Sequence, residues 1–350
     1  MPSHEGRLLA LAAIGALLLG GLAARDGDRR VVTDSAGRHV EIPARVERVF
    51  AAGAPASVAV YVVAPETLLG WALPLSESQR AYLTPQAADL QLRGRLTGRS
   101  NTASLESVIA TRPDLIVDVG EVDDTYVSLA DQVQRQTGIP YLIVAGRLDR
   151  TPEMLATLGD WLGRPERGRE LSERAEAILA DLRAGIAEIS PDRRPRVYLA
   201  RGPSGLETSL SGSINAELIE LLGATNVAET TPATGNPQVS IEQILHWSPD
   251  VILALDPRFV AAIRDDAAWR SVPAVRNGRV YLAPELPFGW IDAPPSVNRL
   301  LGARWAAGVL YRDRFSDDIR PLVRDFFSRF YHVELDPERL GRLLDSIHGH

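Results

Sequence analysis

Two stretches of the chain repeat one pattern, "SLESVIATRPDLIV" (residues 104–117) and "SIEQILHWSPDVIL" (residues 240–253). Ser, Glu, Pro, Asp and one Ile recur in register, and five further positions exchange one aliphatic residue for another. In each stretch a Ser precedes an apolar run with a Glu in its first turn, which predicts an N-capped helix. Pro ends that helix, and the apolar residues after it predict a short buried strand. The same helix–strand element is therefore expected in two separate parts of the chain.

The bulk composition is that of a globular protein large enough for two domains, with 350 residues, 45% hydrophobic and 24% charged. A net charge of −7 argues against a nucleic-acid partner, which would require a basic face. The chain has no Cys, which removes disulfides, thiolate metal sites and a lipid-modified Cys from consideration. We therefore expect a protein without a lipid anchor that is stabilised by burial of apolar surface.

The first thirty residues are typical of a secretory signal peptide. Arg7 precedes an apolar run from Leu8 to Ala24, which ends in small residues before Arg25. We expect residues 1–24 to be the signal peptide, with cleavage after Ala23 or Ala24; an uncleaved membrane anchor is the alternative. No second segment approaches the ~20 apolar residues of a membrane-spanning helix. The mature protein is thus expected in a periplasm.

Strands and helices alternate along the rest of the chain, which predicts an α/β fold with largely parallel sheets. The connecting segment 151–190 contains an apolar stripe at helical spacing, and a helix from Pro165 to Ile189 would be about 37 Å long. We expect two Rossmann-like lobes, residues 25–150 and 191–350, joined by this long α-helix. The predicted strands are 45–53, 113–119, 140–146, 195–202, 249–255 and 277–284; the predicted helices begin at Ala54 or span 104–112, 127–137, 214–223, 240–247 and 295–311, with Pro295 at the start of the last.

The chain resembles the helical-backbone group of periplasmic solute-binding proteins. The resemblance covers about Val32 to Leu344 and rests on "VTDSAGRHVEIPARVERV", "GRLTGRSNTASLESVIATRPDLIVDVG", "ARGPSGLETSLSGSINAELIELLGATNVA" and "LPFGWIDAPPSVNRLLGARWAAGVLY". Members of this group receive iron complexes, haem or cobalamin for an ABC importer, and the chain looks closest to a metal-complex branch that includes molybdate and tungstate binders. The resemblance implies a ligand held between the two lobes.

The resemblance also implies a docking role for the two Glu residues of the repeated pattern. One Glu on each lobe of such proteins faces the membrane permease and pairs with Arg residues there, and the matching positions are Glu106 and Glu242. Complementary charges of this kind would fix the register of docking. The alternative is that each Glu only interacts favourably with its own helix dipole.

Loops that follow the predicted strands are the expected ligand site, because ligands of open α/β sheets bind beyond the carboxyl ends of the strands. These loops are rich in Gly, Ser, Thr and Asn, with Arg99 and Arg201 as cations, which suits an anionic ligand. A solvated loop Arg and a salt bridge within the lobe are the alternatives for the two cations. Tyr126 and Trp290 could wall a large ligand, and Tyr126 could instead coordinate a metal; the alternative for both is packing between the lobes. The predicted ligand contacts are Pro55, Arg99, Ser100, Asn101, Tyr126, Arg201, Ser204, Phe288 and Trp290.

A bare metal site is not expected. The His residues are scattered, and Asp123, Asp124 and Asp292 are interpreted as turn and cap residues rather than metal ligands. Nucleotide-binding and hydrolase motifs are absent from the sequence, so neither an enzyme nor a resident cofactor is expected.

The sequence therefore predicts a monomeric solute-binding component of an ABC importer, with a membrane permease as its partner. The cargo is expected to be a ferric siderophore, haem or corrinoid, and the alternative is molybdate or tungstate. A bulky chelate needs a wide cleft with aromatic walls, whereas a tetrahedral oxyanion needs a small pocket of backbone donors.

Overall fold

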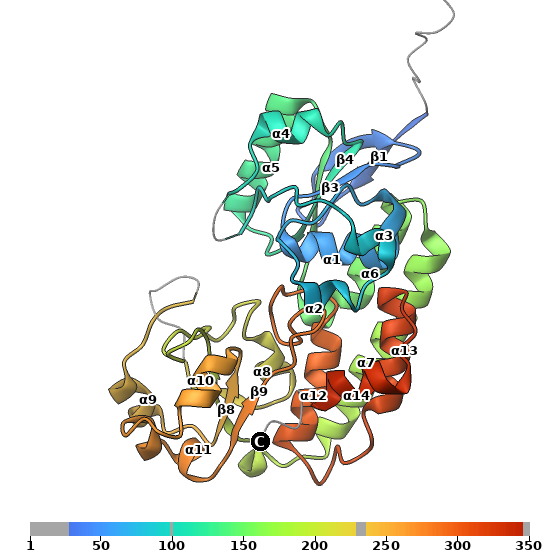
Figure 1. Cartoon of the computed structure of the whole chain (residues 1–350). Coiled ribbons are helices and arrows are strands. Elements are labelled where there is room, and N and C mark those ends of the chain that lie inside the picture. The colour runs from blue at the N-terminus through green and yellow to red at the C-terminus, as the bar shows by residue number, and fades with distance from the viewer. Residues whose placement is uncertain (1–27, 99–100, 229–235, 346–350) are drawn as a thin grey trace, which may run out of the picture.

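The computed structural model describes residues 28–98, 101–228 and 236–345. It consists of two α/β lobes beside a layer of long helices, as Figure 1 shows. Both lobes are built around parallel sheets, so the expected fold class is confirmed. The predicted signal peptide, residues 1–24, lies outside the described residues.

The first lobe has a three-stranded parallel sheet in the order β3-β4-β5. A hairpin of β1 (Arg29–Thr33) and β2 (His39–Pro43), which was not predicted, precedes this sheet. The strands are nearly continuous apolar runs because helices cover the sheet. The remaining elements are β3 (Val49–Ala51), α1 (Ala54–Val63), α2 (Glu77–Arg80), α3 (Pro85–Ala88), α4 (Leu105–Ala110), β4 (Leu115–Gly120), α5 (Asp124–Thr137) and β5 (Tyr141–Ala145).

The second lobe has a four-stranded parallel sheet in the order β7-β6-β8-β9. Its helices are short, and only the last one exceeds two turns. The elements are β6 (Arg196–Ala200), α8 (Glu217–Leu221), β7 (Thr225–Asn226), α9 (Ile241–Trp247), β8 (Val251–Ala254), α10 (Pro257–Ala262), α11 (Pro273–Arg276), β9 (Val280–Leu282) and α12 (Arg299–Leu310).

The repeated pattern forms the same element in both lobes, α4–β4 in the first and α9–β8 in the second. Ser104 and Ser240 cap the two helices through their side chains, as predicted. The residues before the two Pro residues, Arg112 and Ser248, share a left-handed backbone with φ of 47° and 48°. The two copies therefore turn from helix to strand in the same way.

The Asp of each copy ties its strand to the preceding strand of the sheet. Asp114 Oδ2 accepts hydrogen bonds from the Glu47 and Arg48 backbone N–H groups, both at 2.9 Å. Asp250 Oδ2 accepts from the Arg196 N–H at 2.8 Å. These contacts hold β4 beside β3 and β8 beside β6, which explains why Asp recurs in the pattern.

The Arg at the start of each preceding strand completes the motif. Arg48 Nε donates to the Arg112 carbonyl oxygen at 2.9 Å, and Arg196 Nη2 donates to that of Trp247 at 2.8 Å. Each guanidinium thus satisfies a carbonyl group left unpaired at the end of α4 or α9.

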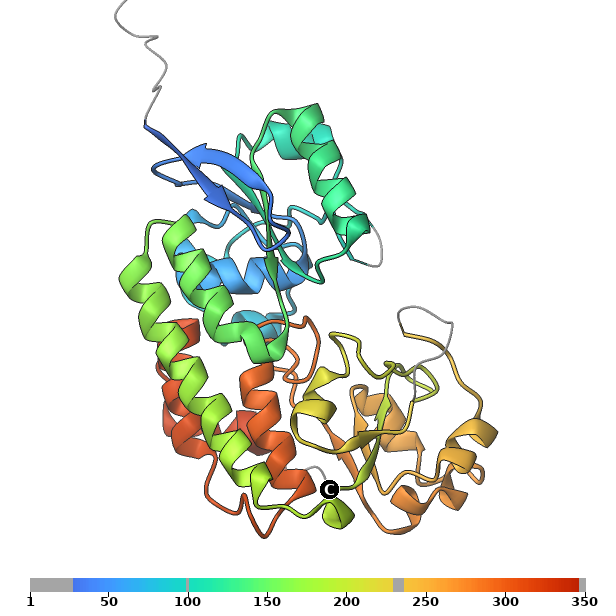
Figure 2. The same cartoon turned by 180° about the vertical axis from the view of Figure 1, so that it is seen from behind.

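Two helices rather than one connect the lobes. The segment folds as α6 (Thr151–Trp161) and α7 (Pro165–Ala187), which lie side by side in Figure 2. A turn through Gly163, with φ of +70°, separates them. Close contact between Gly159 and Gly168, where a Cβ on either would meet the other's backbone at 2.6–2.7 Å, lets the two helices approach. The 23 residues of α7 make it about 34 Å long, so the long helix itself was correctly predicted.

The last two helices, α13 (Arg320–Tyr331) and α14 (Pro337–Asp345), return from the second lobe to the first. The Tyr61 hydroxyl donates to the Tyr331 carbonyl oxygen, and the rings of Tyr61 and Tyr331 stack with centroids 6.5 Å apart. The segment 191–350 thus contributes to the core of both lobes.

Two predicted helices are shorter than expected. The helix predicted at 295–311 begins at Arg299 rather than at Pro295, because Asn298 binds the carbonyl oxygens of Gly289 and Pro294 and holds the preceding residues in a turn. The helix predicted at 214–223 spans only Glu217–Leu221 and is followed by Gly223 in the left-handed conformation.

Candidate ligand site between the lobes

A pocket of about 430 Å³ lies between the two lobes. The first lobe contributes Ser76, Ser78 and Gln79, and Gln79 Nε2 donates across the junction to the Pro287 carbonyl oxygen at 2.9 Å. The second lobe contributes Leu255, residues 283–286 and residues 289–293, which follow β8 and β9. The pocket therefore lies at the carboxyl ends of parallel strands, where α/β proteins bind ligands.

Arg201, which directly follows β6, is held by two carboxylates. Its Nη1 pairs with Asp292, and its Nε lies 3.3 Å from Glu207 Oε1. Asn215 Nδ2 also donates to Asp292 Oδ2, at 2.9 Å. The side chain of Arg201 is 15% exposed. The salt bridge that the sequence left as an alternative is thus formed, and the ligand contact remains a prediction.

Asp292 was interpreted as a turn or cap residue, but it is a buried acceptor at the edge of the pocket. Its side chain is fully buried, and Oδ2 receives both hydrogen bonds. Oδ1 has no hydrogen-bond partner among the described residues. Asp292 does lie in a turn, as interpreted, but its burial was not expected because its partners, Arg201 and Asn215, lie far from it in the sequence.

Phe288, predicted as a ligand contact, and Trp290, predicted to wall a large ligand or to pack between the lobes, both have buried side chains. The Phe288 side chain packs between Trp71 and Tyr331, with both ring centroids 5.6 Å away. Trp290 is 0% exposed, and its Nε1 donates to the Leu286 carbonyl oxygen at 3.0 Å. Trp290 thus lines the pocket while its side chain remains buried, and Phe288 lies behind the lining, in the core.

The start of α1 does not line this pocket but also meets the second lobe, and we call this part of α1 the first-lobe wall. Pro55 is partly exposed in its first turn, and its carbonyl oxygen accepts from Ser296 Oγ of the second lobe at 3.1 Å. Gly53, the N-cap residue, has no side-chain cap, and a Cβ there would lie 2.7 Å from Thr97 Oγ1. This close approach holds Thr97 against the start of α1.

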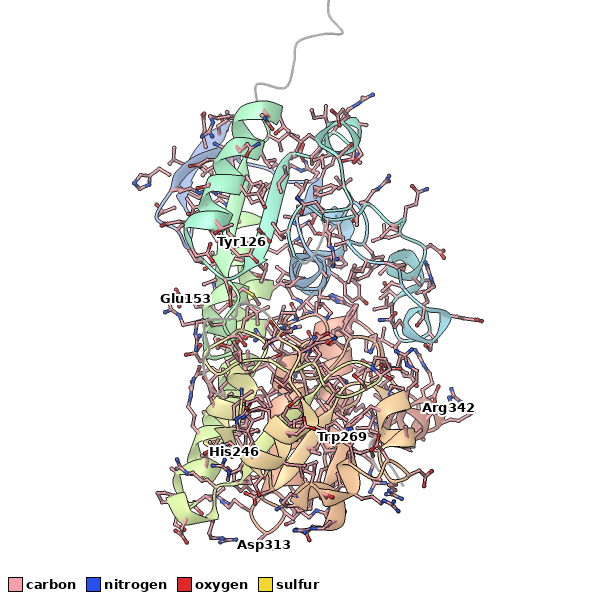
Figure 3. The ribbon with its side chains drawn as sticks, turned by 90° about the vertical axis from the view of Figure 1, so that its left-hand side faces the viewer. Tyr126, Glu153, His246, Trp269, Asp313 and Arg342 are labelled. Atoms are coloured by element: carbon pink, nitrogen blue, oxygen red, sulfur yellow. The ribbon has the colours of Figure 1, made fainter. Side chains whose placement is uncertain are left out.

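Tyr126 lies at the start of α5, at the end of the helix that faces the second lobe in Figure 3. Asp123 caps the helix by accepting from the N–H groups of Thr125 and Tyr126 at 2.8 and 3.1 Å, as predicted for a cap residue. Partial burial, followed by the negative charges of Glu121, Asp118 and Asp123, raises the pKa of the Tyr126 hydroxyl. Tyr126 is therefore a neutral hydrogen-bonding group at the cleft.

The other predicted contacts lie at the ends of loops. Asn101 and Ser204 are exposed, and Ser204 Oγ accepts from the Leu206 N–H at 3.4 Å. Arg99 and Ser100 lie outside the described residues.

A buried ion pair at the junction of the lobes was missed. Arg299 of α12, 1% exposed, pairs with Glu217 of α8 and donates to the Gly146 carbonyl oxygen of the first lobe. Glu217 Oε1 in turn accepts from the Leu148 N–H at 2.7 Å. Burial lowers the pKa of Arg299, and the charge of Glu217 opposes this shift. The pair joins the carboxyl end of β5 to the second lobe.

The signals for the missed residues are charged side chains inside apolar runs. Arg299 begins a nearly all-apolar helix, and Asp118 stands within the apolar strand "LIVDV". A buried charge of this kind requires a partner. The sequence does not indicate which residue that partner is.

Glu106 and Glu242 occupy matching surface positions. Each is the second residue of its helix and is exposed. For both carboxyl groups the pKa is lowered by the residue's own backbone N–H and then by the capping Ser104 or Ser240. In Figure 1, α4 and α9 lie one on each lobe, on the side away from α7. The structure thus presents two ionised carboxylates, one per lobe.

Among the described residues, no helix is both long and apolar enough to cross a membrane.

Comparisons with known proteins are consistent with this architecture. The chain is 28% identical over 342 residues to the molybdate-binding protein MolA of Haemophilus influenzae, covering 89% of this chain and 94% of that protein. It is 26% identical over 224 residues to a vitamin B12-binding protein of Vibrio cholerae, covering 62% and 74%. The structure of an ABC transporter solute binding protein from Sulfurospirillum deleyianum is similar with a TM-score of 0.82 and 29% identity, covering 90% and 99%.

The model of one protein family, described as periplasmic binding protein, matches residues 69–286. This match spans most of both lobes and includes both copies of the repeated element. The chain therefore belongs to the periplasmic binding protein family, as its resemblance to solute-binding proteins predicted.

Proposed function

We propose that this protein is the solute receptor of an ABC importer and carries a small tetrahedral oxyanion of the molybdate and tungstate class between its lobes. The observation that carries the choice of ligand is the burial of Phe288 and Trp290. A bulky chelate would need exposed aromatic walls, whereas these two rings are buried in the core. MolA, a relative whose match covers 89% of this chain, is named for molybdate.

The hydrogen-bond donors where the lobes meet support an oxyanion as the ligand. The first turn of α1 has no side-chain cap and lies where the two lobes meet, and Arg201 contributes a partly exposed guanidinium. Helix N-termini and Arg side chains are the usual donors to tetrahedral anions.

One observation favours the second candidate, a complexed metal such as a corrinoid. Arg201 is already neutralised by Asp292 and Glu207, so the described part of the cleft has no surplus of positive charge at this position. A neutral or cationic complex would not require such a surplus. Vitamin B12-binding relatives are consistent with this candidate.

We also propose that Glu106 and Glu242 are the docking residues for the membrane permease. Their support is the matched geometry of α4 and α9, with the same cap, the same helix position and the same direction of the pKa shift. Two equal charges at fixed separation would recognise two basic sites on the partner. The signal peptide at residues 1–24, a location in the periplasm and a monomeric state remain predictions.

A thermal-shift panel on the protein without residues 1–24 tests the ligand class. The ligands are molybdate, tungstate, sulfate, cobalamin, haem and a ferric hydroxamate. Because a ligand that binds only the folded state raises stability by RT ln(1 + [L]/Kd), tight binding raises Tm. We expect shifts with molybdate and tungstate, and a smaller shift in Arg201→Met. Arg193→Met is the control, since Arg193 pairs with the exposed Asp313 at the far end of the second lobe. A shift with cobalamin or haem alone would favour the second candidate.

A further inference from the structure

One carboxyl group in the first lobe has no counterpart in the second. Asp118 lies in β4 among apolar residues and is 4% exposed. In the repeated element the matching residue of β8 is Ala254, which is fully buried. The helix–strand element therefore does not need an acid at this position to fold.

Asp118 is bound only by neutral groups in the part of the chain that the structure describes. Thr97 Oγ1 donates to Oδ1 and the Tyr141 hydroxyl donates to Oδ2, both at 3.1 Å. Burial raises the pKa of Asp118, and the two hydroxyl donors act in the opposite direction. A buried carboxyl group without a cation costs folding free energy. Its presence calls for a role outside stability.

Thr97 connects Asp118 to the wall of the cleft. The N–H groups of Leu96 and Thr97 donate to the Ala52 carbonyl oxygen at 2.7 and 3.1 Å. The hydroxyl of Thr97 reaches Asp118 while lying against Gly53, the N-cap residue of α1. The Thr97 side chain is 6% exposed, so these protein contacts, rather than hydrogen bonds to water, hold it in place. Thr97 is thus held between the N-terminus of α1 and Asp118 of β4.

The base of the same loop is closed by further hydrogen bonds. The Arg95 carbonyl oxygen accepts from the N–H groups of Thr102 and Ala103 at 2.9 and 3.1 Å. The Arg95 N–H donates to Thr102 Oγ1 at 3.1 Å. Thr97 therefore lies where the hydrogen-bonded base of this loop contacts the first-lobe wall, at the start of α1 near Pro55.

We propose that Asp118 is a positioning residue for ligand binding, which holds Thr97 against Gly53 and so sets the shape of the first-lobe wall. This inference rests on the proposed function, because the wall matters only if the cleft binds a ligand. The acid acts through Thr97 and does not touch the ligand. The second lobe, where Ala254 replaces the acid, builds its wall from Arg201 and Asp292 instead.

Four variants test the role of Asp118. Asp118→Ala introduces the residue found in the second lobe, Thr97→Val removes the hydroxyl, and Asp118→Asn keeps an acceptor for Thr97. Tyr141→Phe is the matched control, because it removes the other hydroxyl donor of Asp118 without touching the wall. The readouts are hydrogen exchange at the Leu96 and Thr97 amides and the affinity for molybdate by equilibrium dialysis.

We expect faster exchange at Leu96 and Thr97 and about tenfold weaker molybdate binding in Asp118→Ala and Thr97→Val, as for the loss of one buried hydrogen bond. Asp118→Asn should restore both readouts, and Tyr141→Phe should leave them unchanged. Unchanged exchange in Asp118→Ala, or equal loss of affinity in Tyr141→Phe, would overturn the proposal. If molybdate does not bind the wild type, the ligand assignment fails. The exchange rates then still decide whether Asp118 holds the wall.

Discussion

The two copies of the helix–strand element agree where they build the sheet and differ where they meet the cleft. Both copies have a Ser cap, a left-handed residue before Pro, and an Asp that binds the preceding strand. They diverge at the end of the strand, where the first lobe has Asp118 and the second has Ala254. The comparison separates residues that the fold requires from residues that serve the individual walls of the binding site.

The largest effect should come from the shared surface positions. Reversing both charges in Glu106→Lys/Glu242→Lys should abolish uptake through the cognate permease, because docking loses its two matched carboxylates. Affinity for the ligand should not change, since neither residue lines the pocket. Transport of labelled ligand in reconstituted vesicles measures the first and dialysis the second.

Glu166→Lys is the control for charge reversal at the same helix position, the second residue of α7. It should transport normally. Normal transport by the double variant would show that the two copies share Glu only for the stability of their helices.

The contact between the lobes should give the largest change in stability. Arg299→Met removes the buried cation of Glu217 and leaves it the half-exposed Arg147, whose Nη2 lies 3.4 Å from Oε2, so the free energy of unfolding should fall by about 3 kcal/mol. Arg174→Met removes a partly exposed ion pair with Asp325 and should cost at most about 1 kcal/mol. Urea denaturation monitored by Trp fluorescence measures both. A loss below about 1 kcal/mol for Arg299→Met would show that the pair does not hold the lobes together.

The shared Asp residues should have unequal effects on stability. Asp114 accepts two backbone hydrogen bonds and Asp250 accepts one from the strand beside it, so Asp114→Ala should cost about 2–3 kcal/mol and Asp250→Ala about 1–2 kcal/mol. The exposed Asp265→Ala should remain within about 0.5 kcal/mol of the wild type. Urea midpoints rank the three variants. The reverse order for Asp114 and Asp250 would contradict the hydrogen-bond assignment.

The smallest effect is a pH dependence of stability that comes from Asp118, the acid that the second copy of the element lacks. Because burial raises the pKa of Asp118, the folded protein keeps a proton that the unfolded chain releases near pH 4, roughly the ordinary value. The stability that Asp118 contributes is therefore complete at low pH and declines as the pH rises through its folded pKa. Asp118→Asn should remove this decline.

The difference in Tm between Asp118→Asn and the wild type should consequently grow from pH 4 to pH 8. Tyr198→Phe is a useful contrast, since burial raises the pKa of that hydroxyl above its ordinary value and it does not titrate in this range. A pH-independent difference for Asp118→Asn would contradict the burial of an ionisable carboxyl group at this position.

Local patterns predicted the parts of the fold that depend on neighbouring residues. The repeat, the caps Ser104 and Ser240, and the long helix α7 all follow from spacing and capping chemistry. Helix α12 begins four residues later than predicted, because the contacts of Asn298 are made with a loop that the sequence pattern does not specify.

The candidate site was less predictable because it depends on distant partners. Arg201 was identified from its place after a strand, but its partner Asp292 lies 91 residues away. Trp290 and Phe288 belong to a loop, yet both are buried: Phe288 packs against Tyr331 of α13 and against Trp71, and Trp290 Nε1 binds the Leu286 carbonyl oxygen. Position in a loop therefore did not indicate exposure.

The most direct test of the account is a calorimetric titration of the protein without residues 1–24 with molybdate, with cobalamin titrated separately as the contrasting ligand. The account predicts one molybdate per chain, competition by tungstate, and no heat of binding with cobalamin. Saturable binding of cobalamin and none of molybdate would contradict it, and would require an exposed aromatic wall that Phe288 and Trp290 do not provide in this structure.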